Sequence, residues 1–219
     1  RAWLEDQGTH TSVLEAFRAN LRRYPPLLPF LMDDPVEELS HLRLHNGTIW
    51  RWNRPLIGFD ADGTPHLRIE HRVLPAGPTV TDSIANAAFF YGLVHALATR
   101  DVAPELELPF ATARDNFYAA ARDGLDAQLT WLDGRKRPVS SLLLEQLIPL
   151  ARYGLGLLDI DAGDRDLYLG IVKARLHNSC TGANWQRAYV ARHGSDMPAL
   201  TEAYYQRQQS GLPVHDWDA

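Results

Sequence analysis

One short stretch of the chain, His45 to Arg72, most constrains the fold, because it combines the pattern of a β hairpin with many charged side chains. Its halves read HNGTIWRWNRP and HLRIEHR, and the turn sequence DADG lies between them. The two expected strands carry Arg51, Arg54, Arg68, Arg72, Glu70, His45, His66 and His71. Charged groups are costly to bury unless they are paired or bound. The hairpin therefore indicates a polar pocket for an anionic ligand, with or without a metal ion.

The second strand, expected over residues 66–74, places its charged residues on one face. A period of two puts Arg68, Glu70 and Arg72 on the same side. A carboxylate beside guanidinium groups can hold Mg²⁺ while the arginines bind phosphate or carboxylate oxygens. An exposed ladder of ion pairs explains the same spacing, and the short string E-x-R does not decide between the two interpretations.

The first strand, expected over residues 48–57, carries tryptophan next to arginine. Trp50, Trp52 and Arg54 share a face with Thr48, and Arg51 lies on the other face. Stacking of a guanidinium on an indole ring can order a ligand-binding arginine. A half-buried aromatic stripe edged by solvated arginines is the alternative, and the pattern slightly favours it.

The histidines near the hairpin give little support for a transition metal. His41 and His45 are four residues apart, but they flank the expected start of a strand, and no third ligand is evident. We expect these two histidines, with His66 and His71, to be core or hydrogen-bonding residues. The single cysteine, Cys180, excludes an internal disulfide and a multi-cysteine metal site. The sequence contains no phosphate-binding glycine loop and no nucleophile elbow, so common hydrolase and dinucleotide-binding folds have no support.

Composition limits the class of partner. The net charge is −5 and the isoelectric point is near 6.0, which gives no support for nucleic acid or an anionic membrane surface as a partner. No apolar run reaches the ~20 residues that span a bilayer. One cysteine suits a reducing compartment. We therefore expect a cytoplasmic protein with small-molecule substrates, and the residues leave formation of a homo-oligomer open.

The 219 residues are expected to form one domain, or a fragment of one, in three parts. Residues 1–40 hold a helix capped by Thr11 or Ser12 and a proline-rich linker, residues 41–80 hold the hairpin, and residues 81–219 are helical in pattern. Helices are expected over residues 81–98, 109–132, 140–158, 164–177, 183–192 and 198–208, with a kink at Pro149. This order predicts an α+β fold in which a charged antiparallel β hairpin packs on a mainly helical bundle.

Three segments together resemble one known family. HNGTIWRWNRP resembles the strand segment H-x-T-T-[IL]-[FW]-x-x-V-R of the type-2 glutamate–cysteine ligases, with matches at His45, Thr48, Ile49, Trp50 and Arg54. HLRIEHR resembles that family's strand with E-x-R, on Glu70 and Arg72. ARDNFYAAARDGLDAQLTWLDG resembles a helix of the bacterial carboxylate–amine ligases. The segments occur in the family's order, over residues 42–134.

The resemblance implies an ATP-dependent ligase built on the C-terminal half of a glutamine-synthetase-like catalytic domain. In that family ATP phosphorylates the γ-carboxylate of glutamate, the amine of cysteine or another amine attacks the acyl phosphate, and Mg²⁺ bridges the phosphates. By transfer, Glu70 is a metal ligand, Arg72 contacts a phosphate of ATP or the acyl phosphate, and Arg54 holds a substrate carboxylate. The other expected substrate-binding residues are His45, Thr48, Trp50, Arg51 and Arg68.

Two departures qualify what the resemblance implies. The family's N-terminal half carries further acidic metal ligands and nucleotide contacts, and no such part is found here, so we expect only part of the active site and an inactive isolated chain. Gly47 replaces a threonine, and Arg51 and Trp52 replace a Pro-x pair of the plant enzymes. The acceptor is therefore cysteine, as in glutathione biosynthesis, or another amine. The alternative is a noncatalytic helical interaction or regulatory module that retains the ligase fold. A histidine-based metal hydrolase is a third interpretation with little support.

Overall fold

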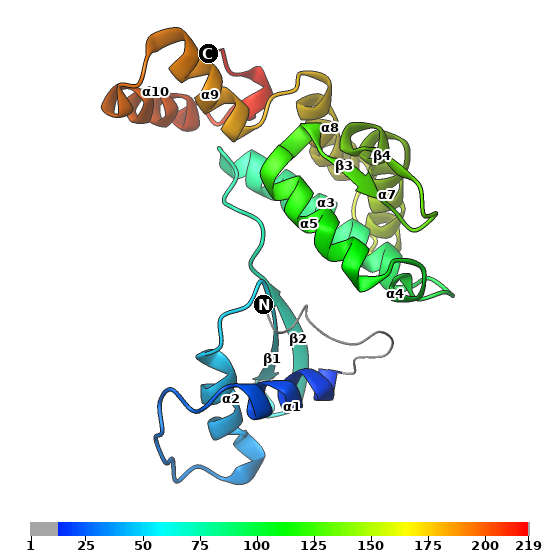
Figure 1. Ribbon diagram of the computed structural model, residues 1–219, viewed down its shortest axis with the longest axis vertical. Coiled ribbons are helices and arrows are strands. Elements are labelled where there is room, and N and C mark those ends of the chain that lie inside the picture. The colour runs from blue at the N-terminus through cyan, green and yellow to red at the C-terminus, as the bar shows by residue number, and fades with distance from the viewer. Residues whose placement is uncertain (1–12, 219) are drawn as a thin grey trace. The chain divides into compact units, whose positions relative to one another are not determined.

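The computed structural model describes residues 13–218 of the chain (Figure 1). The chain forms two compact units, with the boundary between Pro75 and Ala76. Within the described residues, each unit contains helices and one two-stranded antiparallel sheet. This content confirms the predicted α+β class. None of the described helices is both long and apolar enough to cross a membrane.

The first unit consists of helices, a short 3-10 turn and the charged hairpin (Figure 1). In chain order its elements are α1 (Val13–Arg23), η1 (Val36–Glu38), α2 (Ser40–Gly47), β1 (Asn53–Phe59) and β2 (Pro65–His71). Pro25 and Pro26 follow α1 and stop it, because proline has no N–H donor and disfavours helix in the residue before it. The caps expected for this helix, Thr11 and Ser12, lie outside the described residues.

The prediction that the first strand begins at Thr48 is wrong, because α2 occupies the preceding residues and its last turn reaches Thr48. The Thr48 N–H donates to the carbonyls of Leu44 and His45 at 3.2 Å each. The strand starts only at Asn53, and the β-branched and aromatic residues before it form a connection. Strand alternation therefore does not apply to Trp50 and Trp52. The helix also includes both His41 and His45, which the sequence interpretation placed around a strand start.

The predicted turn of the hairpin is confirmed. Residues 60–63 form it, with the Gly63 N–H donating to the Asp60 carbonyl at 3.0 Å. Gly63 has φ of +84°, a conformation that glycine adopts without steric cost.

The register of the hairpin gathers charge on one face. Arg54 lies opposite Glu70, and Leu56 lies opposite Arg68. Because side chains alternate along a strand, these four residues share one face of the sheet. The predicted grouping of Arg68 with Glu70 is therefore correct.

Two buried asparagines connect the helices of the first unit to the hairpin. Asn20 of α1 donates through Nδ2 to Asn46 Oδ1 at 2.9 Å, and Asn46 of α2 donates to the Pro55 carbonyl at 2.6 Å. Pro55 has no N–H, but its carbonyl is thereby satisfied. Buried polar groups are tolerated when they are hydrogen-bonded in this way.

The second unit is mainly helical. Its elements are α3 (Val80–Ala98), α4 (Pro104–Glu107), α5 (Phe110–Asp123), η2 (Gly124–Asp126), β3 (Gln128–Thr130), β4 (Lys136–Pro138), α6 (Val139–Leu142), η3 (Leu143–Leu147), α7 (Ile148–Leu157), α8 (Ala162–His177), α9 (Gly182–His193), α10 (Met197–Gln209) and η4 (Val214–Asp216). The predicted helices over residues 81–98, 164–177, 183–192 and 198–208 are confirmed to within two residues at each end.

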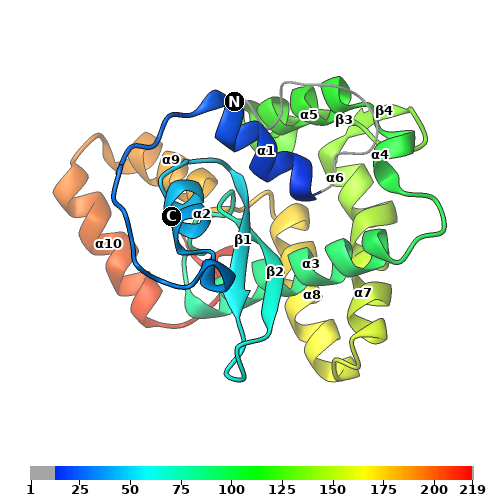
Figure 2. The same cartoon turned by 90° about the horizontal axis from the view of Figure 1, so that it is seen from below.

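Helices α3, α7 and α8 pack side by side (Figure 2). Gly92 of α3 and Gly154 of α7 face each other, and a Cβ added to Gly154 would lie 1.9 Å from the Gly92 carbonyl oxygen. The lack of a side chain at both positions therefore lets the two backbones approach closely. Ala151, Leu155 and Leu169 form a buried cluster in the same group of helices.

The prediction of one helix over residues 109–132 is wrong in its second half. Helix α5 ends at Asp123, because Gly124 has φ of +57° and cannot continue it. The hairpin β3–β4 follows instead. Asn116 of α5 imitates a neighbouring strand, since its Nδ2 donates to the Thr130 carbonyl at 2.6 Å and its Oδ1 accepts from the Thr130 N–H at 3.0 Å.

The helix predicted over residues 140–158 is present, with a π-helical turn (η3) before Pro149. In a regular helix a proline ring collides with the carbonyl four residues earlier, and a wider turn gives it room. The helix thus departs from regular α-helical geometry next to Pro149, where the sequence predicts a kink.

Asp82 links the first turn of α3 to α8 and to the C-terminal segment. Its side chain is fully buried, and Oδ1 accepts from Arg175 Nη2 at 2.5 Å and from Nε at 3.1 Å. Oδ2 accepts from the Thr79 hydroxyl at 2.9 Å and from the Val214 N–H at 3.1 Å. Arg175 Nη1 donates to Asn86 at 2.6 Å, so every nitrogen of this guanidinium has an acceptor.

Candidate functional site

The charged face of the first hairpin brings Arg54, Glu70 and Arg72 together, and we name these three residues the Arg–Glu–Arg cluster. Glu70 Oε2 lies 2.8 Å from Arg54 Nε, 2.7 Å from Arg54 Nη2 and 2.9 Å from Arg72 Nε. The cross-strand register supplies the Arg54–Glu70 pair. Arg72 follows β2 directly, and its N–H extends the ladder by donating to the Trp52 carbonyl at 2.8 Å.

The cluster carries more positive than negative charge. The hydrogen bond from Arg72 lowers the pKa of Glu70 most strongly; burial opposes this shift, and the charge of Arg54 adds to it. Glu70 is therefore ionised at neutral pH, and two guanidiniums share one carboxylate. The excess positive charge favours binding of an oxyanion, for which guanidinium is a well-matched donor.

The two arginines of the cluster differ in their remaining donors. Arg54 Nη1 donates to the Gly47 carbonyl at 2.7 Å, so each nitrogen of Arg54 has an acceptor. Arg72 contacts Glu70 through Nε, and no described residue accepts a hydrogen bond from its Nη1 or Nη2. In this arrangement Arg54 holds Glu70 in place, while Nη1 and Nη2 of Arg72 have no acceptor among the described residues.

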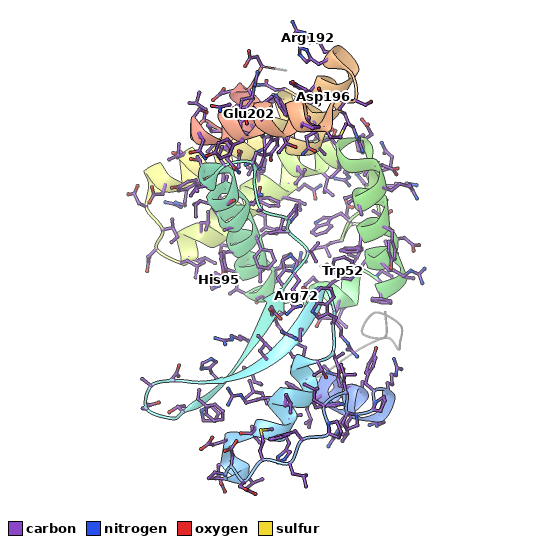
Figure 3. All side chains as sticks on the ribbon, turned by 90° about the vertical axis from the view of Figure 1, so that its left-hand side faces the viewer. Trp52, Arg72, His95, Arg192, Asp196 and Glu202 are labelled. Carbon is purple, nitrogen blue, oxygen red and sulfur yellow. The ribbon has the colours of Figure 1, made fainter. Side chains whose placement is uncertain are left out.

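The ring of Trp50 lies against Arg72 of the cluster, from the connection before β1 and not from the strand on which the sequence interpretation placed it. The Arg72 guanidinium carbon is 5.6 Å from the centre of the Trp50 ring, which is a cation–π distance. The Trp50 side chain is nonetheless 84% exposed. Arg72 and Trp52, which the backbone hydrogen bond joins, lie at the same end of the hairpin (Figure 3).

Arg51 stands apart from the cluster and is buried. It is 7% exposed, and its guanidinium carbon lies 5.4 Å from the centre of the Tyr24 ring. Among the described residues, none accepts a hydrogen bond from Nε, Nη1 or Nη2 of Arg51. Burial lowers the pKa of Arg51, and the hydroxyl of Tyr24 partly opposes the shift.

Three other expected substrate-binding residues have different surroundings. His45 Nε2 donates to the Tyr24 carbonyl at 3.0 Å, and the Thr48 hydroxyl donates to the His45 carbonyl at 2.8 Å. These contacts fasten α2 to the segment after α1 and close its C-terminal turn. Arg68 is exposed on the charged face of β2.

The other histidines considered near the hairpin, His41, His66 and His71, each have a local partner. His41 Nε2 accepts from the Met32 N–H at 3.0 Å, His66 Nδ1 lies 3.1 Å from Asp60, and His71 Nδ1 lies 2.6 Å from Asn53 Oδ1. Among residues 13–218, no three His, Cys, Asp or Glu side chains come together as a metal site.

Glu70 fits a magnesium ligand through one of its two oxygens. Oε2 is shared by the two guanidiniums, whereas Oε1 receives no hydrogen bond from any described residue. Proteins bind Mg²⁺ through one or two carboxylates together with phosphate oxygens and water. Glu70 Oε1 therefore suits a metal ion that also binds a phosphate.

Two groups that contact the arginines of this region could not be identified from the sequence. The Gly47 carbonyl orients Arg54, and Tyr24 stacks on Arg51 from a segment far away in the chain. A backbone carbonyl belongs to every residue, and the approach of Tyr24 depends on how α1 packs. Neither could be selected by residue type and spacing.

A comparison with known protein families identifies the family of this chain. The chain matches the family model of glutamate-cysteine ligase family 2 over residues 32–207. This match includes the Arg–Glu–Arg cluster and most of the second unit, and it confirms the resemblance seen in the sequence. The protein belongs to glutamate-cysteine ligase family 2. No curated protein and no solved structure matches the chain significantly.

Proposed function

We propose that the protein is an ATP-dependent carboxylate–amine ligase that activates the γ-carboxylate of glutamate as an acyl phosphate. Membership of the family supports an activity of the glutamate–cysteine ligase type. The observation that carries the proposal is the Arg–Glu–Arg cluster, in which Arg72 has two terminal nitrogens without an acceptor among the described residues. Transfer of a phosphoryl group depends mainly on positioning and on stabilisation of negative charge.

In this proposal Arg72 binds the transferring phosphoryl group. Its Nε remains on Glu70, so the planar guanidinium is fixed and its two terminal nitrogens point to one ligand. Such a fork matches two phosphate oxygens. Arg72 thereby stabilises the charge that develops as the γ-phosphate of ATP passes to the glutamate carboxylate. The acyl phosphate is then attacked by the amine, and phosphate leaves.

Glu70 and Arg54 prepare the position of Arg72. Arg54 holds Glu70 Oε2 through two nitrogens and is itself anchored on the Gly47 carbonyl. This leaves Glu70 Oε1 as the atom that would hold Mg²⁺, whose chemistry is to neutralise phosphate oxygens. We therefore assign Arg54 a positioning role in addition to the carboxylate binding implied by the family.

The proposal is tested on the full-length protein by the release of ADP from ATP, Mg²⁺ and glutamate, with cysteine and a panel of other amines. We expect release that depends on both glutamate and one amine. Arg72→Gln should lower kcat/KM by about a hundredfold, as the loss of one charge-stabilising donor does elsewhere. Arg18→Gln is the matched control, because it removes an exposed arginine of the same unit whose partner among the described residues is Glu15.

Two results would argue against the proposal. Folded protein without ADP release for any amine would favour the noncatalytic interaction module. Release that Arg72→Gln leaves unchanged would remove Arg72 from the site.

A further inference from the structure

Arg51 is a buried cation without a counter-ion among the described residues. Its three guanidinium nitrogens are shielded from solvent, and none has an acceptor in the part of the chain that the structure describes. Arginine keeps its proton in proteins, so burial cannot be relieved by neutralisation. A buried charge without a partner is strongly unfavourable.

Two other enclosed arginines, Arg54 and Arg175, differ from Arg51 in their hydrogen bonds. Arg54 and Arg175 have side chains 11% and 12% exposed, and an acceptor lies at each of their nitrogens. Tyr24 offers Arg51 a cation–π contact at 5.4 Å, and its hydroxyl partly opposes the lowering of the pKa of Arg51, but a phenol ring does not supply the negative charge of a counter-ion. Arg51 therefore differs from Arg54 and Arg175, because none of its three guanidinium nitrogens has an acceptor among the described residues.

The surroundings of Arg51 favour an incoming anion. The positive charge of Arg23 acts on Arg51 in addition to burial. The residues on either side of it in the chain, Trp50 and Trp52, are 84% and 51% exposed, so the backbone of this segment lies at the surface. A ligand that binds the guanidinium would therefore approach it from the side of this exposed segment.

We propose that Arg51 is a specificity-determining residue that binds the α-carboxylate of an amino-acid substrate. A carboxylate accepts two parallel hydrogen bonds from a guanidinium and supplies the missing negative charge. The choice of an amino acid as ligand rests on the proposed ligase function. Two substrates of such a ligase carry this group, the glutamate that is activated and the amine that attacks, and the experiment separates them.

Isothermal titration calorimetry with two matched pairs of ligands tests the assignment. Glutamate is compared with 4-aminobutyrate, and cysteine with cysteamine; the second member of each pair lacks only the α-carboxylate. The protein should bind one amino acid at least tenfold more tightly than its decarboxylated counterpart. Arg51→Met should abolish that difference, and Arg51→Lys should restore part of it.

Thermal unfolding without ligand distinguishes this role from a structural one, because replacement of an arginine that stabilises the fold would lower Tm. Because no described residue supplies a counter-ion to Arg51, Arg51→Met should leave Tm unchanged or raise it. If Arg51→Met does not fold, Arg51→Gln takes its place in both measurements.

The assignment is overturned by equal affinity of the parent for both members of each pair, by no binding of any of the four ligands, or by a preference for the carboxylate that survives in Arg51→Met. Failure of the ligase function gives a different pattern, with no ADP release but with binding that still depends on Arg51.

Discussion

At the scale of single residues, three charged side chains have different surroundings. Glu70 is shared by two arginines, Asp82 is fully enclosed by donors, and Arg51 is enclosed without an acceptor among the described residues. The sequence indicates which residue types are charged, but enclosure depends on the packing around them. This is why the charged hairpin could be selected from its sequence, whereas the burial of Arg51 and the complete pairing of Arg54 could not.

Glu70 makes stability depend on pH in a predictable direction. Its pKa is lowered in the folded protein, so its ion pairs stabilise the fold above the ordinary glutamate pKa of about 4.3 and are lost as the pH falls through the lowered value. Glu70→Gln should therefore lower Tm at neutral pH and have little effect in strong acid. Thermal unfolding of both proteins across this range checks the prediction, and an equal Tm difference at every pH would contradict it.

At the scale of elements, local signals predict helices well and their ends less well. Apolar periodicity and caps locate α3 and α8–α10 to within two residues. The short hairpin β3–β4 is missed because its strands have three residues each, too few for an alternation to be recognised. The start of β1 is misplaced because Thr48 to Trp52 have strand-like side chains, while the preceding residues complete the helix α2.

Alanine substitutions at Gly154, where α7 lies close to α3, and at Gly170 in α8 should have opposite effects on the free energy of unfolding. Gly154→Ala should lower the free energy of unfolding by about 1–3 kcal/mol or more, because the added Cβ would collide with the Gly92 carbonyl. Gly170→Ala in α8 is the matched control, since nothing lies within 4 Å of its added Cβ. It should raise stability by about 0.4–1 kcal/mol through helix propensity. Denaturant unfolding measures the stability of both variants. Equal effects on the free energy of unfolding would contradict the close approach of α3 and α7.

At the scale of the whole molecule, sequence reasoning identifies the family and the α+β class, because three motifs in order are specific even when each is short. It does not find the contacts between distant segments. Residues 82, 175 and 214 carry no motif, yet Asp82 joins α3, α8 and the C-terminal segment within the second unit. Only the folded chain brings these residues together.

Removal of this link should destabilise the second unit strongly. Asp82→Asn leaves the enclosed Arg175 without a counter-charge, and breaking a buried pair in this way costs about 3–5 kcal/mol. The measurement is urea unfolding followed by tryptophan fluorescence, since Trp185 and Trp217 pack in the same unit. A loss below about 1 kcal/mol, the range of a surface ion pair, would show that the link contributes little.

The central claim is that the protein activates a carboxylate as an acyl phosphate at the Arg–Glu–Arg cluster. Hydroxylamine is a small amine that converts such an intermediate into a hydroxamate, which forms a coloured complex with ferric ion. With ATP, Mg²⁺ and glutamate, the full-length protein should form γ-glutamyl hydroxamate together with ADP and phosphate. The Arg72→Gln variant should lose most of this activity, while Arg18→Gln retains it. Folded protein that forms no hydroxamate, or an Arg72→Gln variant that forms it at the parent rate, would contradict the account.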